Sequence, residues 1–118
     1  MAFDWLEYLR FAEELSQFPH ASQESYKRSV ASRTYYAAYH HTKNYLIRSH
    51  QLNGEKHEHI IQALKSHRQK DQKKVGVDLE RLKNIRVRAD YNPEKFDENL
   101  REVIKTASRI IHLVDSFD

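Results

Sequence analysis

The feature that most constrains the fold is the scarcity of residues that interrupt regular structure. Only two glycines and two prolines occur in 118 residues, and these residue types are the usual punctuation of turns and loops. No glycine or proline occurs between positions 20 and 53, and no segment alternates apolar and polar residues as a strand would. The sequence therefore predicts an all-α fold, an antiparallel bundle of four to five helices.

Capping residues and a proline set the expected bounds of the first two helices. Asp4 is suited to cap a helix that ends near Pro19, because the residue before a proline is pushed away from helical dihedrals. Ser22, or alternatively Ser25, then caps a long helix that reaches about residue 50 and is stopped before Gly54. Apolar side chains surround this helix instead of forming one stripe, so we expect it to be central in the bundle.

Three further helices are expected in the second half of the chain. A helix from His57 to His67 is followed by the run Arg68 to Lys74, which is too polar to be buried and should be a loop or a solvated helix end. Apolar residues from Val77 to Val87 outline a shorter fourth helix. Asn92 and Pro93 combine a cap residue with a proline suited to the first helical position, so the last helix should begin there.

Composition limits the class of protein. The chain has 39% hydrophobic residues and no cysteine, which is enough for a core and leaves no disulfide, thiolate metal site or cysteine nucleophile. The length predicts one domain over residues 1–118. With neither a signal pattern nor 18 consecutive uncharged apolar residues, we expect no membrane span and a cytoplasmic location. The net charge is only +3, so a basic surface requires local clustering.

Arg33 and His40 are the candidate catalytic residues. They lie seven positions apart, which at 100° per residue is about 20° short of two turns, so both leave the same helix face. Tyr36 and Asn44 extend that face as candidate substrate-binding residues. An arginine within a helix that is apolar nearly all round needs partners or solvent access, so a groove or an interface is implied.

The chemistry that this pair suits is metal-free RNA cleavage. A guanidinium holds phosphate in a fixed fork, and an imidazole exchanges protons near neutral pH. The reaction also needs separate base, acid and charge-stabilising roles, which one Arg33 and one His40 cannot all fill. A symmetric homodimer would supply two of each. The competing interpretation is structural, with Arg33 paired to a carboxylate of another helix and His40 a hydrogen-bonded core residue.

Two further arginines are candidate substrate-binding residues, and one histidine pair is a poor metal site. Arg86 and Arg88 could donate to phosphate if they face the same groove. Alternatively, the helix dipole favours arginines near a helix C-terminus, and either arginine pairs with Asp90 or with a carboxylate of the last helix. His57 and His59 are two positions apart and point away from each other on a helix, so we expect neither a metal nor another cofactor.

Three segments resemble one known family. Residues Ser32 to His40 read SRTYYAAYH, which is similar to the SRAYYAAFH helix of HEPN-domain proteins. Lys56 and His57 resemble the Lys-Thr-His segment of that family, and Arg86 to Tyr91, RVRADY, resembles its R-x-x-A-D-Y segment. The resemblance covers roughly residues 5–117 and implies a HEPN-like bundle of four or five helices.

The resemblance also implies a range of functions. Active HEPN proteins are frequently homodimers and carry an Arg-x(4 to 6)-His motif associated with metal-independent RNA cleavage, a spacing that Arg33 and His40 satisfy. Thr34 follows the arginine, where active members usually have Asn, Asp or His. Other relatives are nucleotide-binding proteins or partners of nucleotidyltransferases in toxin-antitoxin pairs. A toxin-like ribonuclease, a non-catalytic subunit of this kind and a structural oligomerisation module therefore all stay open.

Overall fold

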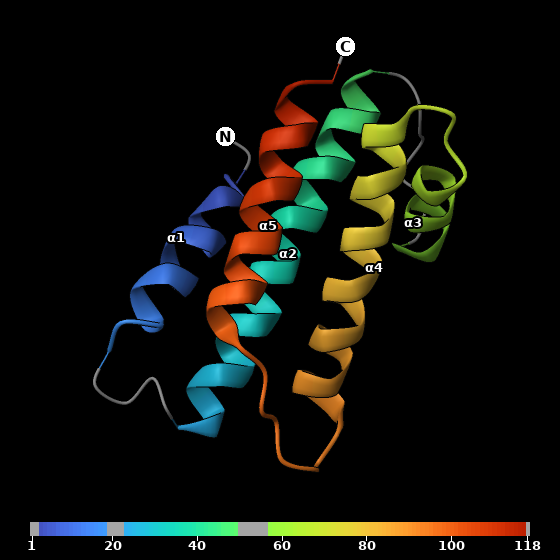
Figure 1. Cartoon of the computed structure of the whole chain (residues 1–118). Coiled ribbons are helices and arrows are strands. Elements are labelled where there is room, and N and C mark those ends of the chain that lie inside the picture. Colours follow the sequence, from blue (N-terminus) through green and yellow to red (C-terminus); the bar gives the residue numbers. More distant parts are fainter. Residues whose placement is uncertain (1–2, 19–22, 50–56, 118) are drawn as a thin grey trace.

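The computed structural model describes residues 3–18, 23–49 and 57–117, and within them it contains five helices and no strand (Figure 1). The helices are α1 (Leu6–Leu15), α2 (Glu24–Arg48), α3 (His57–Lys65), α4 (Lys70–Tyr91) and α5 (Leu100–Asp115). The prediction of an all-α bundle is confirmed. No helix in the described part of the chain is long and apolar enough to cross a membrane.

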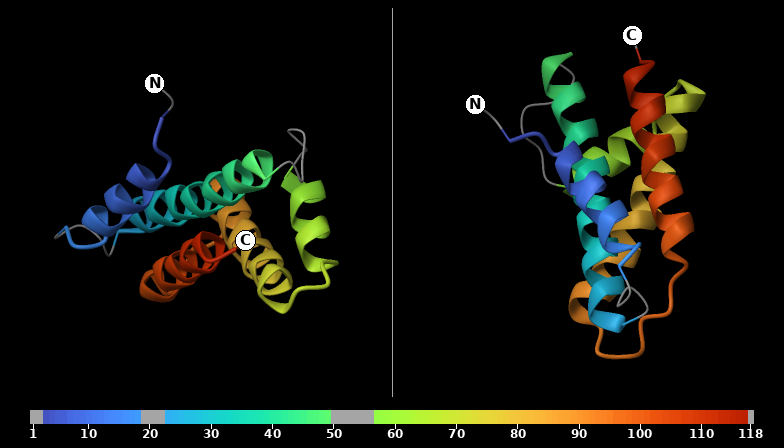
Figure 2. Two further views of the ribbon diagram at one scale, coloured as in Figure 1. Left: turned by 90° about the horizontal axis from the view of Figure 1, so that it is seen from above. Right: turned by 90° about the vertical axis from the view of Figure 1, so that its left-hand side faces the viewer.

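The long helix α2 is central, as its all-round apolar pattern predicts. It packs against α1, α4 and α5. Along the bundle α1 and α4 run opposite to α2, whereas α5 runs opposite to α4 and therefore in the same direction as α2 (Figure 1). The short helix α3 packs on the outer side of α4, near the end where α4 begins (Figures 1 and 2).

Two tyrosines of α2 occupy the centre of the core. Tyr35 and Tyr39 are completely buried, and they pack with apolar residues of the other helices, among them Ile60, Leu64, Leu79, Leu82 and Ile110. Burial disfavours a charged phenolate, so it raises the pKa of Tyr35 and raises the pKa of Tyr39 to about 12. Both phenols are therefore neutral at physiological pH.

A glycine allows α3 to approach α4 closely. A Cβ atom at Gly76 would lie 2.6 Å from the backbone nitrogen of Lys65 and 2.8 Å from the Cβ of Leu64. Beside this contact, the Lys65 ammonium donates to both carboxylate oxygens of Glu80, at 2.9 and 3.0 Å. A mid-helix glycine usually weakens a helix, so here its small size is what the packing of α3 requires.

The predicted length of the fourth helix was wrong. It begins at Lys70 instead of Val77 and has 22 residues. In the polar run, Arg68 and Gln69 precede the helix, and Lys70 to Lys74 form its first turn, so each of the two alternatives holds for part of the run. Gln72 is only 3% exposed, so the run is not wholly at the surface. The Gln72 amide donates to the side chain of Gln69 at 3.3 Å, which partly offsets the cost of burying it.

The predicted start of the last helix was also wrong. Residues 92–99 are not helical, and α5 begins at Leu100. The Asn99 side chain accepts a hydrogen bond from the backbone of Glu102 at 3.3 Å, which is the geometry of an N-cap. Asn92 and Pro93 instead belong to the loop that joins α4 to α5.

The observed bounds of the other helices agree with the predicted bounds to within a few residues. The first helix ends at Leu15, and Asp4 caps it by accepting from the backbone nitrogen of Leu6 at 3.0 Å. Gln23 is the N-cap of α2 and Ser25 lies inside the helix, so the alternative cap at Ser25 was wrong. The predicted signals at Ser22, Pro19, Asn53 and Gly54 lie outside the described residues.

We expect Gly76→Ala to destabilise the protein although alanine is the better helix former. Helix propensity favours the variant by about 1 kcal/mol, whereas overpacking against a backbone costs about 1–3 kcal/mol. Urea unfolding should show a net decrease in the free energy of unfolding. The matched control is Asn84→Ala on an exposed part of the same helix. A stabilised Gly76→Ala variant would contradict the close approach of α3.

Candidate functional site

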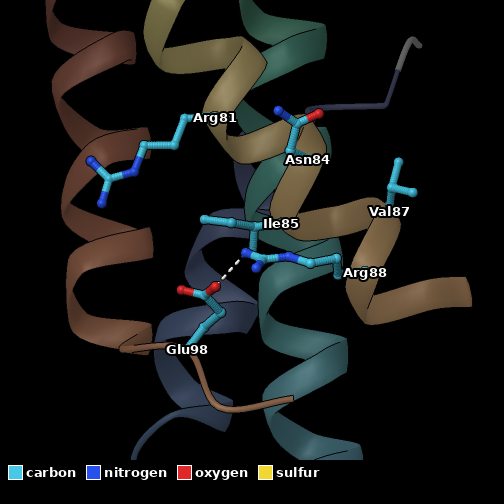
Figure 3. Close-up of a pocket in the computed structure, with 6 residues that line it drawn as sticks. All are labelled: Arg81, Asn84, Ile85, Val87, Arg88 and Glu98. Carbon is cyan, nitrogen blue, oxygen red and sulfur yellow. Dashed lines mark hydrogen bonds and ion pairs between the residues drawn. The ribbon is translucent and has the colours of Figure 1, made fainter. Parts of the chain in front are cut away.

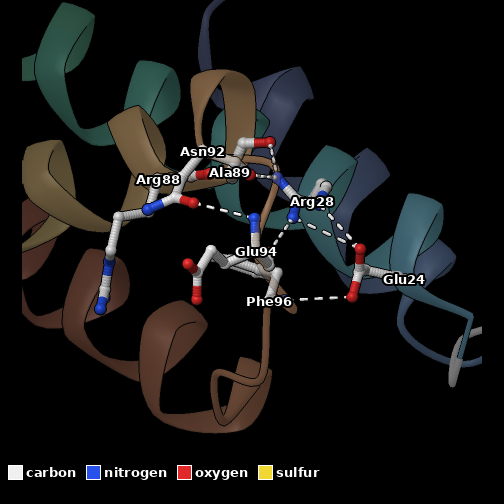
Figure 4. A network of polar contacts seen from close by, with 7 residues as sticks. All are labelled: Glu24, Arg28, Arg88, Ala89, Asn92, Glu94 and Phe96. Atoms are coloured by element: carbon white, nitrogen blue, oxygen red, sulfur yellow. Dashed lines mark hydrogen bonds and ion pairs between the residues drawn. The ribbon is translucent and has the colours of Figure 1, made fainter.

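One arginine holds the end of α4 and the loop after it. The Arg28 guanidinium of α2 donates to the carbonyl oxygens of Arg88, Ala89 and Asn92 at 3.1, 2.8 and 2.8 Å, and to that of Glu94 at 2.6 Å (Figure 4). The last carbonyls of a helix lack intrahelical partners, so Arg28 caps α4 from a neighbouring helix. This role could not be predicted from the sequence, since nothing local to Arg28 indicates contacts 60 to 66 positions away.

Glu24 completes this network. Its carboxylate accepts from the Arg28 side chain at 3.3 Å and from the backbone nitrogen of Phe96 at 3.0 Å (Figure 4). The hydrogen bond from Phe96 is the main reason that the pKa of Glu24 is lowered, and the charge of Arg28 adds to it. Arg28 and Glu24 together hold residues 92–96 outside a helix, which explains why the predicted helix start at Asn92 failed.

A groove of about 290 Å³ opens beside this network, between α1, the first half of α2 and the end of α4. The residues that line it are Tyr8 of α1, Arg28, Ser29, Ser32, Arg33 and Tyr36 of α2, and Asp90 of α4. The groove thus contains two arginines, two serine hydroxyls, two phenols and one carboxylate. We call it the Arg33 groove.

Arg33 is packed against aromatic rings and not against a carboxylate. Its guanidinium carbon lies 5.3 Å from the ring centre of Tyr8 and 4.9 Å from that of Phe11, both on α1. The side chain is half-buried. Within residues 3–18, 23–49 and 57–117 we find no hydrogen bond or ion pair that it makes, so the predicted alternative of an ion pair is not observed there.

His40 lies on the same face of α2, two turns further along. Its ring stacks on Trp5 with centroids 3.7 Å apart and planes inclined by 17°, and the residue is partly exposed. Arg33 and His40 therefore leave α2 on the same side, as their spacing predicts, Arg33 against α1 and His40 against Trp5 just before it. His40 does not line the Arg33 groove, and the catalytic roles assigned to the pair stay predictions.

The structure brings Tyr36 to this groove but not Asn44. The Tyr36 ring is 5.9 Å from the ring of His40 and 5.3 Å from the guanidinium carbon of Arg86. Asn44 is exposed, and its side chain makes no hydrogen bond to the part of the chain that the structure describes. Tyr36 thus lines the groove, whereas Asn44 lies beyond His40 on the helix.

Arg86 is held next to the groove by an ion pair and aromatic rings. Its Nη1 donates to Oδ2 of Asp90 at 3.3 Å, and the same oxygen accepts from the Ser32 hydroxyl at 3.3 Å. The Arg86 side chain is 11% exposed. Burial by itself lowers the pKa of Arg86, but the Tyr36 phenol and Asp90 outweigh it and the pKa is raised. Arg86 therefore stays charged.

Arg88 faces a different side of α4. It lines a cavity of about 600 Å³ together with Arg81 and Glu98, and it forms an ion pair with Glu98 (Figure 3). Arg86 and Arg88 thus do not share a groove, so their predicted joint role in substrate binding is not supported by the geometry. Each pairs with a carboxylate, as the structural alternative expects.

No group of three or more His, Cys, Asp or Glu side chains that could hold a metal ion is found among the described residues.

His41, which was not among the candidate residues, forms a hydrogen bond with Asp115 of α5 at 2.7 Å. This contact joins α2 to the end of α5.

The comparison with protein families decides the identity of the fold. A model of the HEPN domain matches residues 6–117. The chain belongs to the HEPN family. This confirms the resemblance of the three segments and indicates a function related to nucleotides or RNA. None of the curated proteins and none of the solved structures matches the chain. That residues 1–118 form one domain stays a prediction.

We expect Arg28→Lys to destabilise this HEPN domain. Lysine carries one ammonium and cannot reproduce the fork that reaches four carbonyl groups, and a hydrogen bond from a charged group contributes about 1.5–3 kcal/mol net of the hydrogen bonds to water that it replaces. Urea unfolding should show a decrease of at least about 1.5 kcal/mol.

Lys27→Ala is the control for this prediction. It removes a cation from the same turn of α2. The Lys27 ammonium lies 4.0 Å from the exposed Asp97 carboxylate, and such exposed ion pairs contribute about 0–1 kcal/mol. A loss in Arg28→Lys no larger than the loss in Lys27→Ala would contradict the fork geometry as the support of the loop.

Proposed function

We propose that this HEPN protein binds RNA or a nucleotide through a phosphate group in the Arg33 groove. The observation that carries the proposal is that Arg33 has no carboxylate partner among the described residues. Tyr8 and Phe11 cover its guanidinium, and contacts of this kind orient the group without using its N–H donors. Those donors suit the oxygens of a phosphate.

The rest of the groove supports the same function. Ser29 and Ser32 supply hydroxyl groups on the Arg33 face of α2, and Tyr8 and Tyr36 supply aromatic rings beside them. Proteins that bind single-stranded RNA commonly combine cations for the backbone with aromatic rings on which bases stack. The groove therefore offers both kinds of contact within about 290 Å³.

We expect Arg33→Ala to weaken binding of a short single-stranded RNA at least tenfold. The loss of a charge-assisted hydrogen bond to phosphate is worth about 1.5–3 kcal/mol. The measurement is fluorescence anisotropy with a labelled oligonucleotide at fixed salt, because phosphate binding depends on ionic strength. Arg81→Ala is the matched control, since it removes an exposed arginine that lines the other cavity. Equal losses in both variants would indicate unspecific attraction and contradict the proposed site.

A second candidate function is metal-independent RNA cleavage by a homodimer. It is favoured by the placement of His40, which lies on the Arg33 face of α2 and is partly exposed. Stacking on Trp5 fixes the plane of the imidazole while its nitrogens lie at the ring edge, where proton transfer takes place. Since one arginine and one histidine cannot fill all roles, a second copy of the chain would contribute its own pair.

For cleavage, we expect His40→Ala to reduce the rate at least 100-fold while RNA binding and dimerisation are kept, because general acid-base catalysis contributes about 10²–10⁴-fold. The assay uses RNA in the presence of EDTA, with light scattering to follow the oligomer. The control is His41→Asn, which changes the adjacent histidine that bonds to Asp115. Absence of cleavage by the wild-type protein would reject this candidate and leave the binding function intact.

The remaining expectations concern partners. A nucleotidyltransferase partner, a toxin-antitoxin role, a purely structural oligomerisation role and a cytoplasmic location stay predictions. The contacts within one chain bear on none of them.

A further inference from the structure

Among the described residues that line the Arg33 groove, Asp90 is the one negatively charged side chain. This carboxylate lines the groove opposite a face that is otherwise basic and hydroxyl-bearing. A carboxylate in a groove that binds phosphate repels the ligand, because both are negatively charged. The position of Asp90 therefore calls for an explanation beyond phosphate binding itself.

The neighbours of Asp90 fix its position. Its Oδ2 accepts from both Arg86 and Ser32, each at 3.3 Å, and the side chain is 31% exposed. Arg86 is itself held between Tyr35, Tyr36 and Tyr91, with its guanidinium carbon 5.3 to 6.0 Å from their ring centres. These contacts hold one carboxylate oxygen of Asp90 in the groove wall.

The three arginines at this site are used differently. Arg28 donates to four backbone carbonyl groups, and the charge of Arg86 is paired with Asp90. Of the three, Arg33 is the arginine whose side chain makes no hydrogen bond or ion pair to the described residues, so its donors can bind a ligand. A ligand that enters the groove therefore meets one available guanidinium and one carboxylate.

We propose that Asp90 makes the groove selective for a phosphodiester over a terminal phosphate monoester. The inference rests on the proposed phosphate-binding function and names its substrate class, an internal linkage of an RNA chain. A phosphodiester carries one negative charge, whereas a monoester carries about 1.5 to 2 at pH 7. Arg33 matches the first charge. Asp90 is paired with Arg86, but of this pair only the carboxylate lines the groove, so a second charge on the ligand meets the negative end of the pair and is repelled.

The test compares two ligands that differ by this charge and by one methyl group. Adenosine 5′-monophosphate and its phosphate methyl ester each compete with labelled RNA for the wild-type protein. We expect the methyl ester to bind more tightly, although a purely basic groove would favour the more charged monoester. The preference should shrink as salt increases from 50 to 500 mM, because screening weakens the repulsion by Asp90.

The variant Asp90→Asn should reduce or reverse the preference by about threefold to tenfold, the effect of one unit charge a few ångströms away in a groove that is open to water. Release of Arg86 raises the affinity for both ligands, so the ratio of the two affinities is the readout. Glu98→Gln is the matched control, because Glu98 also pairs with an arginine of α4 but lines the other cavity. Circular dichroism checks that both variants fold.

The outcomes separate the inference from the function beneath it. A wild-type preference for the methyl ester that Asp90→Asn removes and Glu98→Gln keeps supports the role of Asp90. Equal wild-type affinities, or a ratio that Asp90→Asn leaves unchanged, overturns the inference while phosphate binding stands. Failure of both ligands and of RNA to bind the wild-type protein overturns the proposed function and the inference together. If Asp90→Asn does not fold, the sign and salt dependence of the wild-type preference decide.

Discussion

The candidate site depends on the contact between the Arg28 guanidinium and the end of α4. Four carbonyl groups of residues 88–94 accept from this one side chain, which ties the central helix to a loop more than 60 positions away. The contact fixes where α4 ends and therefore where Asp90 and Arg86 lie relative to α2. It adds to the core packing between α2 and α4 and fixes the end of α4 that forms one wall of the Arg33 groove.

The opposite wall is set by α1, which packs on α2 through the buried cluster of Ala12, Leu15 and Val30 and through aromatic contacts. Trp5 stacks on His40, while Tyr8 and Phe11 lie over Arg33. These contacts use the faces of the imidazole and guanidinium groups and not their hydrogen-bonding edges. The packing of one short helix thus orients both functional groups and still leaves them partly exposed.

The distribution of charge gives the groove its chemical character. Of the arginines near the groove, Arg28 serves the backbone and Arg86 is neutralised by Asp90, so the excess of basic residues overstates the positive charge that a ligand meets. A single available cation beside a fixed carboxylate is suited to a singly charged phosphate. The HEPN fold supplies the scaffold, and these particular side chains determine what the groove can accept.

The sequence by itself determined the helical class, the central place of α2, the HEPN family and the shared face of Arg33 and His40, because periodicity and capping act over neighbouring residues. It did not determine the length of α4, the start of α5 or the separate directions of Arg86 and Arg88. Those features were decided by tertiary structure. Gln72 is buried by its packing, and the loop after Asn92 is held by Arg28 and Glu24, contacts between distant segments that no local pattern encodes.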